Sequence, residues 1–188
     1  MERPGMKHDL RKVADTLLEV ARPWLVKTKS SPVLVAFGLP DGTLEHIQLS
    51  DEMANRAMSS GRTKDLFFGL IRDMAQSVDA TVVAISTEGW AARSTPAAQA
   101  IPETEFRRLS SLNDGFEALL SMGLVERREV IQVTVQDVDE VLNLTQAFQR
   151  QEDGTPYDLA EPEEQRMPQS GYEGRTKMFG KLTEETTR

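Results

Sequence analysis

Apolar residues recur at three- and four-residue spacing in two long stretches of the chain, the pattern of a helix with one buried face. The first stretch predicts a helix over residues 7–22, which Pro23 ends because proline has no amide hydrogen for the helical ladder. The second predicts the clearest helix of the chain over residues 63–77, and its apolar stripe must cover a sheet. Between the two, Ser50 is a typical cap for a short helix that runs to Met58.

Short apolar runs and alternating runs predict the strands. Residues 33–37 and 81–85 are rich in branched apolar side chains, which is typical of strands buried on both faces. Residues 43–49 alternate and follow a turn that contains Gly and Pro, so they predict a hairpin with the first of these strands. Residues 128–136 alternate in the same way. Residues 138–150 fit either a helix or a strand, and the short link before them favours an antiparallel strand.

The middle and the end of the chain carry weaker patterns. Residues 86–114 predict an irregular stretch with a helix start near Pro102, and a further helix follows at 116–122. After Arg150, acidic residues, Gly, Pro, Thr and Gln dominate, and the few apolar side chains cannot offset the entropy of ordering the chain. Residues 151–188 therefore predict a polar, flexible C-terminal tail. The alternative is an arm that becomes ordered on a partner subunit.

In chain order, these elements predict a single α+β domain over residues 1–150, followed by the tail over residues 151–188. Strands joined by hairpins give a mixed or largely antiparallel sheet of about five strands. Amphipathic helices must cover one face of this sheet, which makes the fold a two-layer sandwich. A doubly wound nucleotide-binding sheet is not expected, because the chain has neither a phosphate loop nor a Gly-x-Gly-x-x-Gly motif after a strand.

The composition excludes several kinds of chemistry. The chain has no cysteine, so it has no disulfides, thiolate metal sites or cysteine nucleophiles. Its two histidines, His8 and His46, lie on different predicted elements, where they do not make a zinc site. No Gly-x-Ser-x-Gly turn presents a serine nucleophile. We therefore expect neither a metal site nor a cofactor.

The formal net charge of −8 disfavours direct binding to nucleic-acid phosphates. The charge is uneven, because the first 29 residues carry a net +3 and the remainder −11. The basic end is either a solvated helix face or a docking surface for an anionic partner or a second copy. An acidic body can also imitate nucleic acid. The apolar runs are too short to span a membrane and no secretory signal is visible, so we expect a cytoplasmic protein without membrane contact.

Charged and aromatic residues gather beyond the buried strand 81–85 and at the start of the strand 128–136. Side chains just past the end of a central strand are often functional. An arginine from the second strand that pairs with Glu88 would build a charged pocket beside Trp90. In the simpler alternative, Trp90 fills the core and the charges form a surface ladder. The candidate binding residues are Glu88, Trp90, Arg93, Arg127 and Arg128.

A strand that ends in Glu88-Gly89-Trp90, followed by a variable loop and then by Arg127-Arg128-Glu129 at the start of another apolar strand, resembles a pattern in small proteins of bacteria and their phages. The resemblance covers residues 33–150, and these proteins more often have Ala at the position of Gly89. The resemblance implies the same α+β architecture and a bacterial or phage setting. It transfers no catalytic role, because that family has no established activity.

Three hypotheses for function follow. The first is a non-enzymatic protein that associates with another protein or with itself, as a homo-oligomer, through an exposed strand edge or the C-terminal arm. The second is an enzyme that uses Glu88 as an acid or metal ligand, with Arg93 or Arg128 holding the substrate. The third is an acidic inhibitor that imitates nucleic acid.

Overall fold

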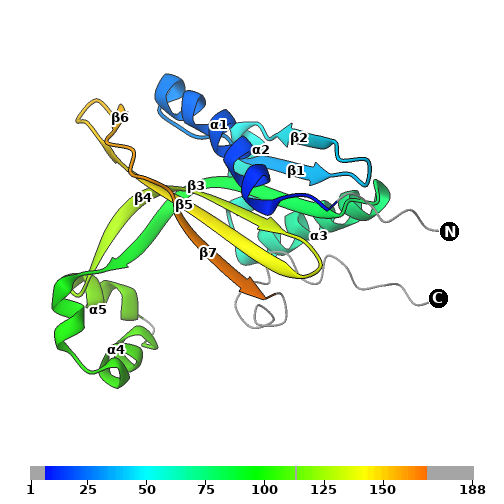
Figure 1. Ribbon diagram of the computed structural model, residues 1–188. Helices are drawn as coiled ribbons and strands as arrows, with labels where there is room; N and C mark the ends of the chain where they lie inside the picture. Colours follow the sequence, from blue (N-terminus) through cyan, green and yellow to red (C-terminus); the bar gives the residue numbers. More distant parts are fainter. Residues whose placement is uncertain (1–6, 113, 169–188) are drawn as a thin grey trace.

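The computed structural model describes residues 7–112 and 114–168 (Figure 1). No helix in this part of the chain is long and apolar enough to cross a membrane. The elements are α1 (Leu10–Thr28), β1 (Leu34–Gly38), β2 (Leu44–Gln48), α2 (Asp51–Met58), α3 (Gly61–Ser77), β3 (Val82–Ser94), the 3₁₀ helix η1 (Pro96–Ala100), α4 (Glu103–Ser110), α5 (Gly115–Ser121), β4 (Val125–Gln136), β5 (Glu140–Arg150), β6 (Pro156–Tyr157) and β7 (Glu163–Pro168).

The strands form one curled antiparallel sheet in the order β2-β1-β3-β4-β5, and both β6 and β7 pair with the outer edge of β5. The sheet curves into half a barrel instead of lying flat (Figure 1). The predicted α+β class is confirmed, as is the hairpin formed by β1 and β2. Residues 140–150 form a strand, as the short link before them predicted.

The helix α1 covers one face of the sheet, which we call the α1 face. Asp9 caps the first turn, since its carboxylate accepts hydrogen bonds from the amides of Arg11 and Lys12. The buried side of α1 packs on alternate residues of four strands, because alternate strand residues point to the same face. The strand residues in this cluster are Leu34, Ala36, Val82, Ala84, Ile131, Val133, Val135, Leu142, Leu144 and Phe148.

The prediction that Pro23 ends the first helix is wrong. The helix continues through Pro23 to Thr28. Proline removes one hydrogen bond from the ladder, but Leu25, two residues further on, is fully buried in the cluster beneath α1. Burial of this side chain holds the last turns of the helix on the sheet.

The helix α3 packs on the opposite face, where the odd-numbered residues of β1 point. Val35 and Phe37 contact a second cluster that includes Phe68 and Ile71 of α3. The start of α3 is fixed by a reciprocal capping box between Ser60 and Thr63. Helices therefore lie on both faces of the β1–β3 part of the sheet, and not on one face as predicted. This explains why both strands are continuous apolar runs.

The strands β3 and β4 extend beyond the rest of the sheet and form an arm, residues 90–128. This arm carries η1, α4 and α5 (Figure 1). The stretch 86–114 is thus less irregular than predicted, because β3 continues to Ser94. The predicted helix starts near residues 102 and 116 are confirmed by α4 and α5. These short helices fold onto the arm through a third cluster that contains Leu109, Leu119, Leu124 and Val125.

The prediction of a flexible tail from residue 151 is wrong for residues 151–168, and residues 169–188 lie outside the described part of the chain. The strand β7 pairs with β5 over six residues, from Glu163 opposite Thr145 to Pro168 opposite Glu140. The composition did not reveal this strand, because β7 is an edge strand whose charged side chains form ion pairs instead of joining an apolar core.

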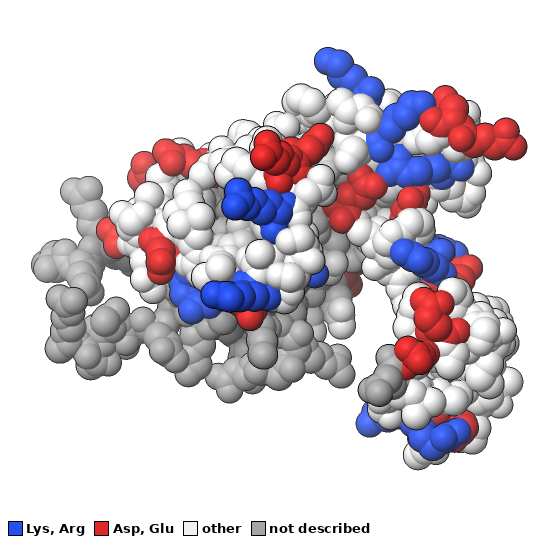
Figure 2. Space-filling model, turned by 180° about the vertical axis from the view of Figure 1, so that it is seen from behind, with Lys and Arg blue, Asp and Glu red and all other residues white. Residues whose placement is uncertain are grey.

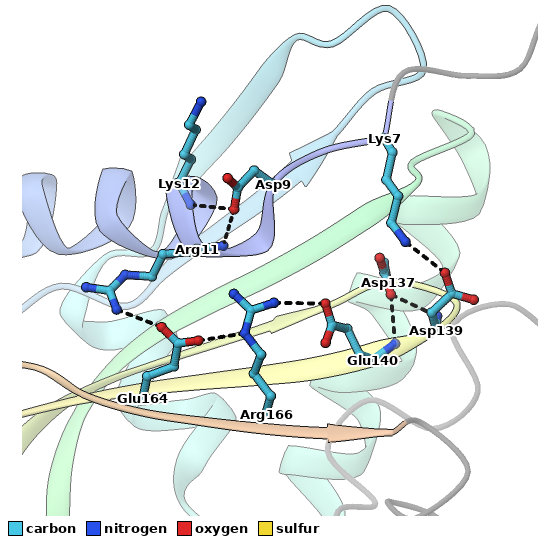
Figure 3. A network of polar contacts seen from close by, with 9 residues as sticks. All are labelled: Lys7, Asp9, Arg11, Lys12, Asp137, Asp139, Glu140, Glu164 and Arg166. Carbon is cyan, nitrogen blue, oxygen red and sulfur yellow. Dashed lines mark hydrogen bonds and ion pairs between the residues drawn. The ribbon is translucent and has the colours of Figure 1, made fainter.

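A chain of ion pairs fastens β7 to α1 and β5 (Figure 3). Arg11 of α1 binds Glu164 at 2.7 Å, Glu164 binds Arg166 at 2.6 Å, and Arg166 binds Glu140 of β5 at 3.0 Å. Hydrogen bonds from Arg166 and Arg11 hold the pKa of the Glu164 carboxyl below its ordinary value of 4.5. Folding therefore gains from this carboxylate above that pH, and the gain is lost as the pH falls through the lowered pKa.

Candidate functional site

The strands β4 and β5 separate at one point of the sheet, which we call the fork. Their pairing ends where Glu129 faces Phe148, so the first four residues of β4, Val125–Arg128, have no paired strand on the β5 side among the described residues. Beyond the fork, the arm runs towards α4 and α5, while β5 turns away with β6 (Figure 1). The fork encloses a hollow of about 620 Å³, whose lining includes Trp90, Arg127, Glu129, Phe148 and Arg150.

The backbone of β4 has hydrogen-bonding groups at the fork that no described strand receives, and those of Arg127 lie beside the hollow. The carbonyl of Leu124 accepts a bond from the amide of Thr95 on the β3 side. Successive residues of a strand face opposite edges, so the N–H and C=O groups of Val125 and Arg127 face the β5 side. No described strand lies there to receive them. The fork thus offers a short free strand edge, of which residues 126–128 line the hollow.

Arg150, the last residue of β5, joins the charges at the fork. Its guanidinium binds Glu88 of β3 at 2.6 Å and Glu129 of β4 at 2.9 Å. The three side chains are only 18% to 24% exposed, so water screens these pairs less than it screens a surface pair. This cluster ties three neighbouring strands together on the α1 face.

Further contacts anchor the same cluster to the backbone. Arg150 donates to the carbonyls of Lys29 at 2.8 Å and Gly154 at 2.9 Å. The second oxygen of Glu88 accepts a hydrogen bond from the amide of Ser31 at 2.7 Å. Because these partners come from the loop after α1 and the turn before β6, Arg150 fixes one wall of the fork.

The other wall carries an aromatic residue under a cation. The guanidinium carbon of Arg127 lies 4.0 Å from the centre of the Trp90 ring, a cation–π contact. Trp90 is nevertheless 57% exposed. Trp90 and Arg127 also line a second hollow of about 400 Å³, together with Phe116 of α5. Exposed aromatic area of this kind is a typical anchor at protein interfaces.

The candidate residues named from the sequence divide into two groups. Glu88, Trp90 and Arg127 lie on the α1 face at the fork, as the alternation along the paired strands requires. Arg128 also lines the hollow, but it points to the opposite face and binds Glu126. Arg93 does not line either hollow.

The predicted ion pair between Glu88 and Arg127 or Arg128 is wrong, because Glu88 binds Arg150 instead. Arg150 is not among the residues predicted from the sequence, where it is the last residue before the predicted tail. One signal was present, since Arg150 continues the even-numbered set of residues 142–148 in the strand that the pattern favoured. Glu88 and Arg150 are 62 positions apart in the sequence, so no local pattern indicates that they pair.

Both oxygens of the Glu88 carboxylate are bound, one by Arg150 and the other by the Ser31 amide. This geometry gives Glu88 a structural role in the wall of the fork. In the described part of the chain, no group of three or more acidic or histidine side chains is placed to hold a metal ion. The acid or metal-ligand role considered for Glu88 therefore has no supporting geometry here.

The charges near the fork are mixed in sign. Figure 2 shows the small α4–α5 lobe set apart from the body by an indentation, with basic and acidic side chains interspersed on both sides. Arg127, Arg128 and Arg150 line the hollow together with Glu126, Glu129 and Asp158. A mixed lining of this kind does not form the single-sign field that a phosphate backbone or a nucleic-acid mimic requires.

Comparison of the sequence with protein-family models and curated proteins, and of the fold with solved structures, finds no significant match. The resemblance to small bacterial and phage proteins therefore stays a prediction. The function has to be argued from the geometry of the fork.

Proposed function

We propose that this protein is a non-enzymatic, cytoplasmic interaction module that binds an extended polypeptide segment at the fork. The observation that carries the proposal is the unpaired edge of β4 at Val125–Arg128, of which residues 126–128 line a hollow. A bound segment would take the place that β5 leaves free, and its backbone would pair with Val125 and Arg127. Addition of a strand to an exposed sheet edge is a common mode of peptide recognition.

The surroundings of this edge favour a bound peptide. A free strand edge of only four residues is too short to recruit a second sheet without help from side chains. Trp90 supplies exposed aromatic area beside the edge, and Arg127 supplies a cation that can pair with a carboxylate while it stacks on the ring. The Arg150 cluster holds the opposite wall in place before any partner arrives, which reduces the entropy lost on binding.

Peptides selected from a random displayed library on the full chain test this proposal. We expect Trp90→Ala to weaken their binding at least about tenfold, because truncation of an interface tryptophan commonly costs 2 kcal/mol or more. Isothermal titration calorimetry measures the change. The matched control is Trp24→Ala, which alters the other tryptophan, on α1 and outside both hollows. Selected peptides that bind the two variants equally well would contradict the proposal.

A further inference from the structure

The outer side of α3 carries an exposed apolar pair. Leu66 and Leu70 are 67% and 56% exposed, and Leu66 is the most exposed large apolar side chain among the described residues. They are four residues apart, so they are neighbours on the helix surface. The opposite side of α3 already packs on the sheet through Phe68 and Ile71. The two leucines therefore form a second apolar surface that the core does not use.

Two opposite charges continue this surface along the helix. Arg62 precedes Leu66 by four residues and Asp73 follows Leu70 by three, so all four side chains share one side of α3, which we call the α3 stripe. Arg62 and Asp73 are exposed, and neither forms an ion pair within the described residues. The α3 stripe thus has a cation at one end, two leucines in the middle and a carboxylate at the other end.

The helix itself does not favour these two charges. Arg62 lies in the first turn of α3, where the helix dipole favours an anion. Asp73 lies towards the other end, where the dipole favours a cation. The order of the charges is therefore better explained by a partner outside the helix than by the stability of α3 alone.

Gly69, between the two leucines, also has no role inside the described part of the chain. Glycine is less favourable than alanine in the interior of a helix. A Cβ built at Gly69 has no atom within 4 Å, so the fold leaves room for a side chain there. Glycine at this position lets a second backbone come close to α3.

A second copy of α3 fits the α3 stripe when it runs antiparallel. A two-fold axis midway between Leu66 and Leu70 places Leu66 of each copy opposite Leu70 of the other. Arg62 lies four residues before the one leucine, and Asp73 lies three residues after the other. The same register therefore brings Arg62 of each copy level with Asp73 of the other, within one residue.

A second pair of charges supports this register. Asp65 and Arg72 are seven residues apart, so they lie on the same flank of α3. A two-fold axis perpendicular to both helices turns each flank towards the same flank of the partner, and Asp65 of one copy then lies level with Arg72 of the other, within one residue. Neither residue forms an ion pair within the described residues, where the buried Nε of Arg72 has no hydrogen-bond partner.

We infer that α3 pairs with α3 of a second copy in an antiparallel dimer with two-fold symmetry. Its contacts are Leu66 with Leu70, Arg62 with Asp73, and Asp65 with Arg72, and each contact occurs twice. A pair of single helices is a small interface, so the dimer is in equilibrium with the monomer. The inference is independent of the proposed function, because α3 packs on the opposite face of the sheet from α1 and the Arg150 cluster.

Charge reversal in the full chain tests the helix pair. Sedimentation equilibrium over a series of protein concentrations should show a monomer–dimer equilibrium for the unaltered protein. Arg62→Glu and Asp73→Lys should each raise the dimer dissociation constant at least about tenfold, because like charges then meet twice in each dimer. Thermal unfolding of dilute protein should show that neither variant is less stable as a monomer, since each introduces a charge that the helix dipole favours.

The matched control is Lys64→Glu, which makes the same change of charge as Arg62→Glu. Lys64 is exposed but lies two residues before Leu66, on the other side of the helix. This variant should leave the dimer dissociation constant unchanged. An effect of Lys64→Glu as large as that of Arg62→Glu would overturn the inference, because net charge and not the register would then govern association.

Mixing the two weakened variants is the sharper experiment. In a mixed dimer every reversed charge meets its opposite, so an equimolar mixture of Arg62→Glu and Asp73→Lys should restore dimerisation. The double variant Arg62→Glu/Asp73→Lys should dimerise alone for the same reason. An unaltered chain that stays monomeric, a dimer that Arg62→Glu does not weaken, or a mixture no stronger than either variant would overturn the inference.

Discussion

Replacement of Arg150 by Met should lower the free energy of unfolding by about 3 kcal/mol, because loss of one partner from a largely buried ion pair leaves uncompensated charge. The two carboxylates left behind, Glu88 and Glu129, are at most 24% exposed and no longer share a cation. The backbone carbonyls of Lys29 and Gly154 also lose their donor. Equilibrium urea unfolding of the full chain measures the loss.

A second set of variants separates charge from packing. Adding Glu88→Gln and Glu129→Gln to the Arg150→Met chain removes the unpaired charges and should recover more than half of the loss. A loss below about 1 kcal/mol for Arg150→Met, or no recovery in the triple variant, would show that this cluster does not hold the fork.

Leu25→Ala should lower the free energy of unfolding by about 3 kcal/mol, within the range measured for large-to-small substitutions in protein cores. Leu25 is fully buried under the last turns of α1, beyond Pro23. Its neighbour Val26 is 53% exposed, so Val26→Ala is the matched control and should change stability by less than about 0.5 kcal/mol. Thermal and urea unfolding compare the two variants. Equal effects would mean that α1 does not pack on the sheet beyond the proline.

Local patterns predicted most of the elements. The continuous apolar run of β1 predicted a strand buried on both faces, and α1 and α3 do cover its two sides. The continuation of α1 past Pro23 could not be predicted in the same way, because the burial of Leu25 depends on strands far away in the sequence. The strand β7 was not predicted for a related reason, since it is held by pairing with β5 and by ion pairs to α1.

The candidate site was predicted in part. The alternation along β3 and β4 places Glu88, Trp90 and Arg127 together on one face. It does not reveal where β5 leaves β4, because that point depends on the turn of the chain after Arg150 and not on any motif. The free edge of β4, which carries the proposed function, is therefore a property of the assembled sheet.

Amide hydrogen exchange at the fork tests this free edge most directly. The amides of Val125 and Arg127 should exchange rapidly, while those of Glu126 and Arg128, which face β3, stay protected. A saturating library-selected peptide should then slow Val125 and Arg127 at least about tenfold and leave the other two unchanged. Val125 and Arg127 amides that are already protected without a peptide, or that do not respond to one, would contradict the account.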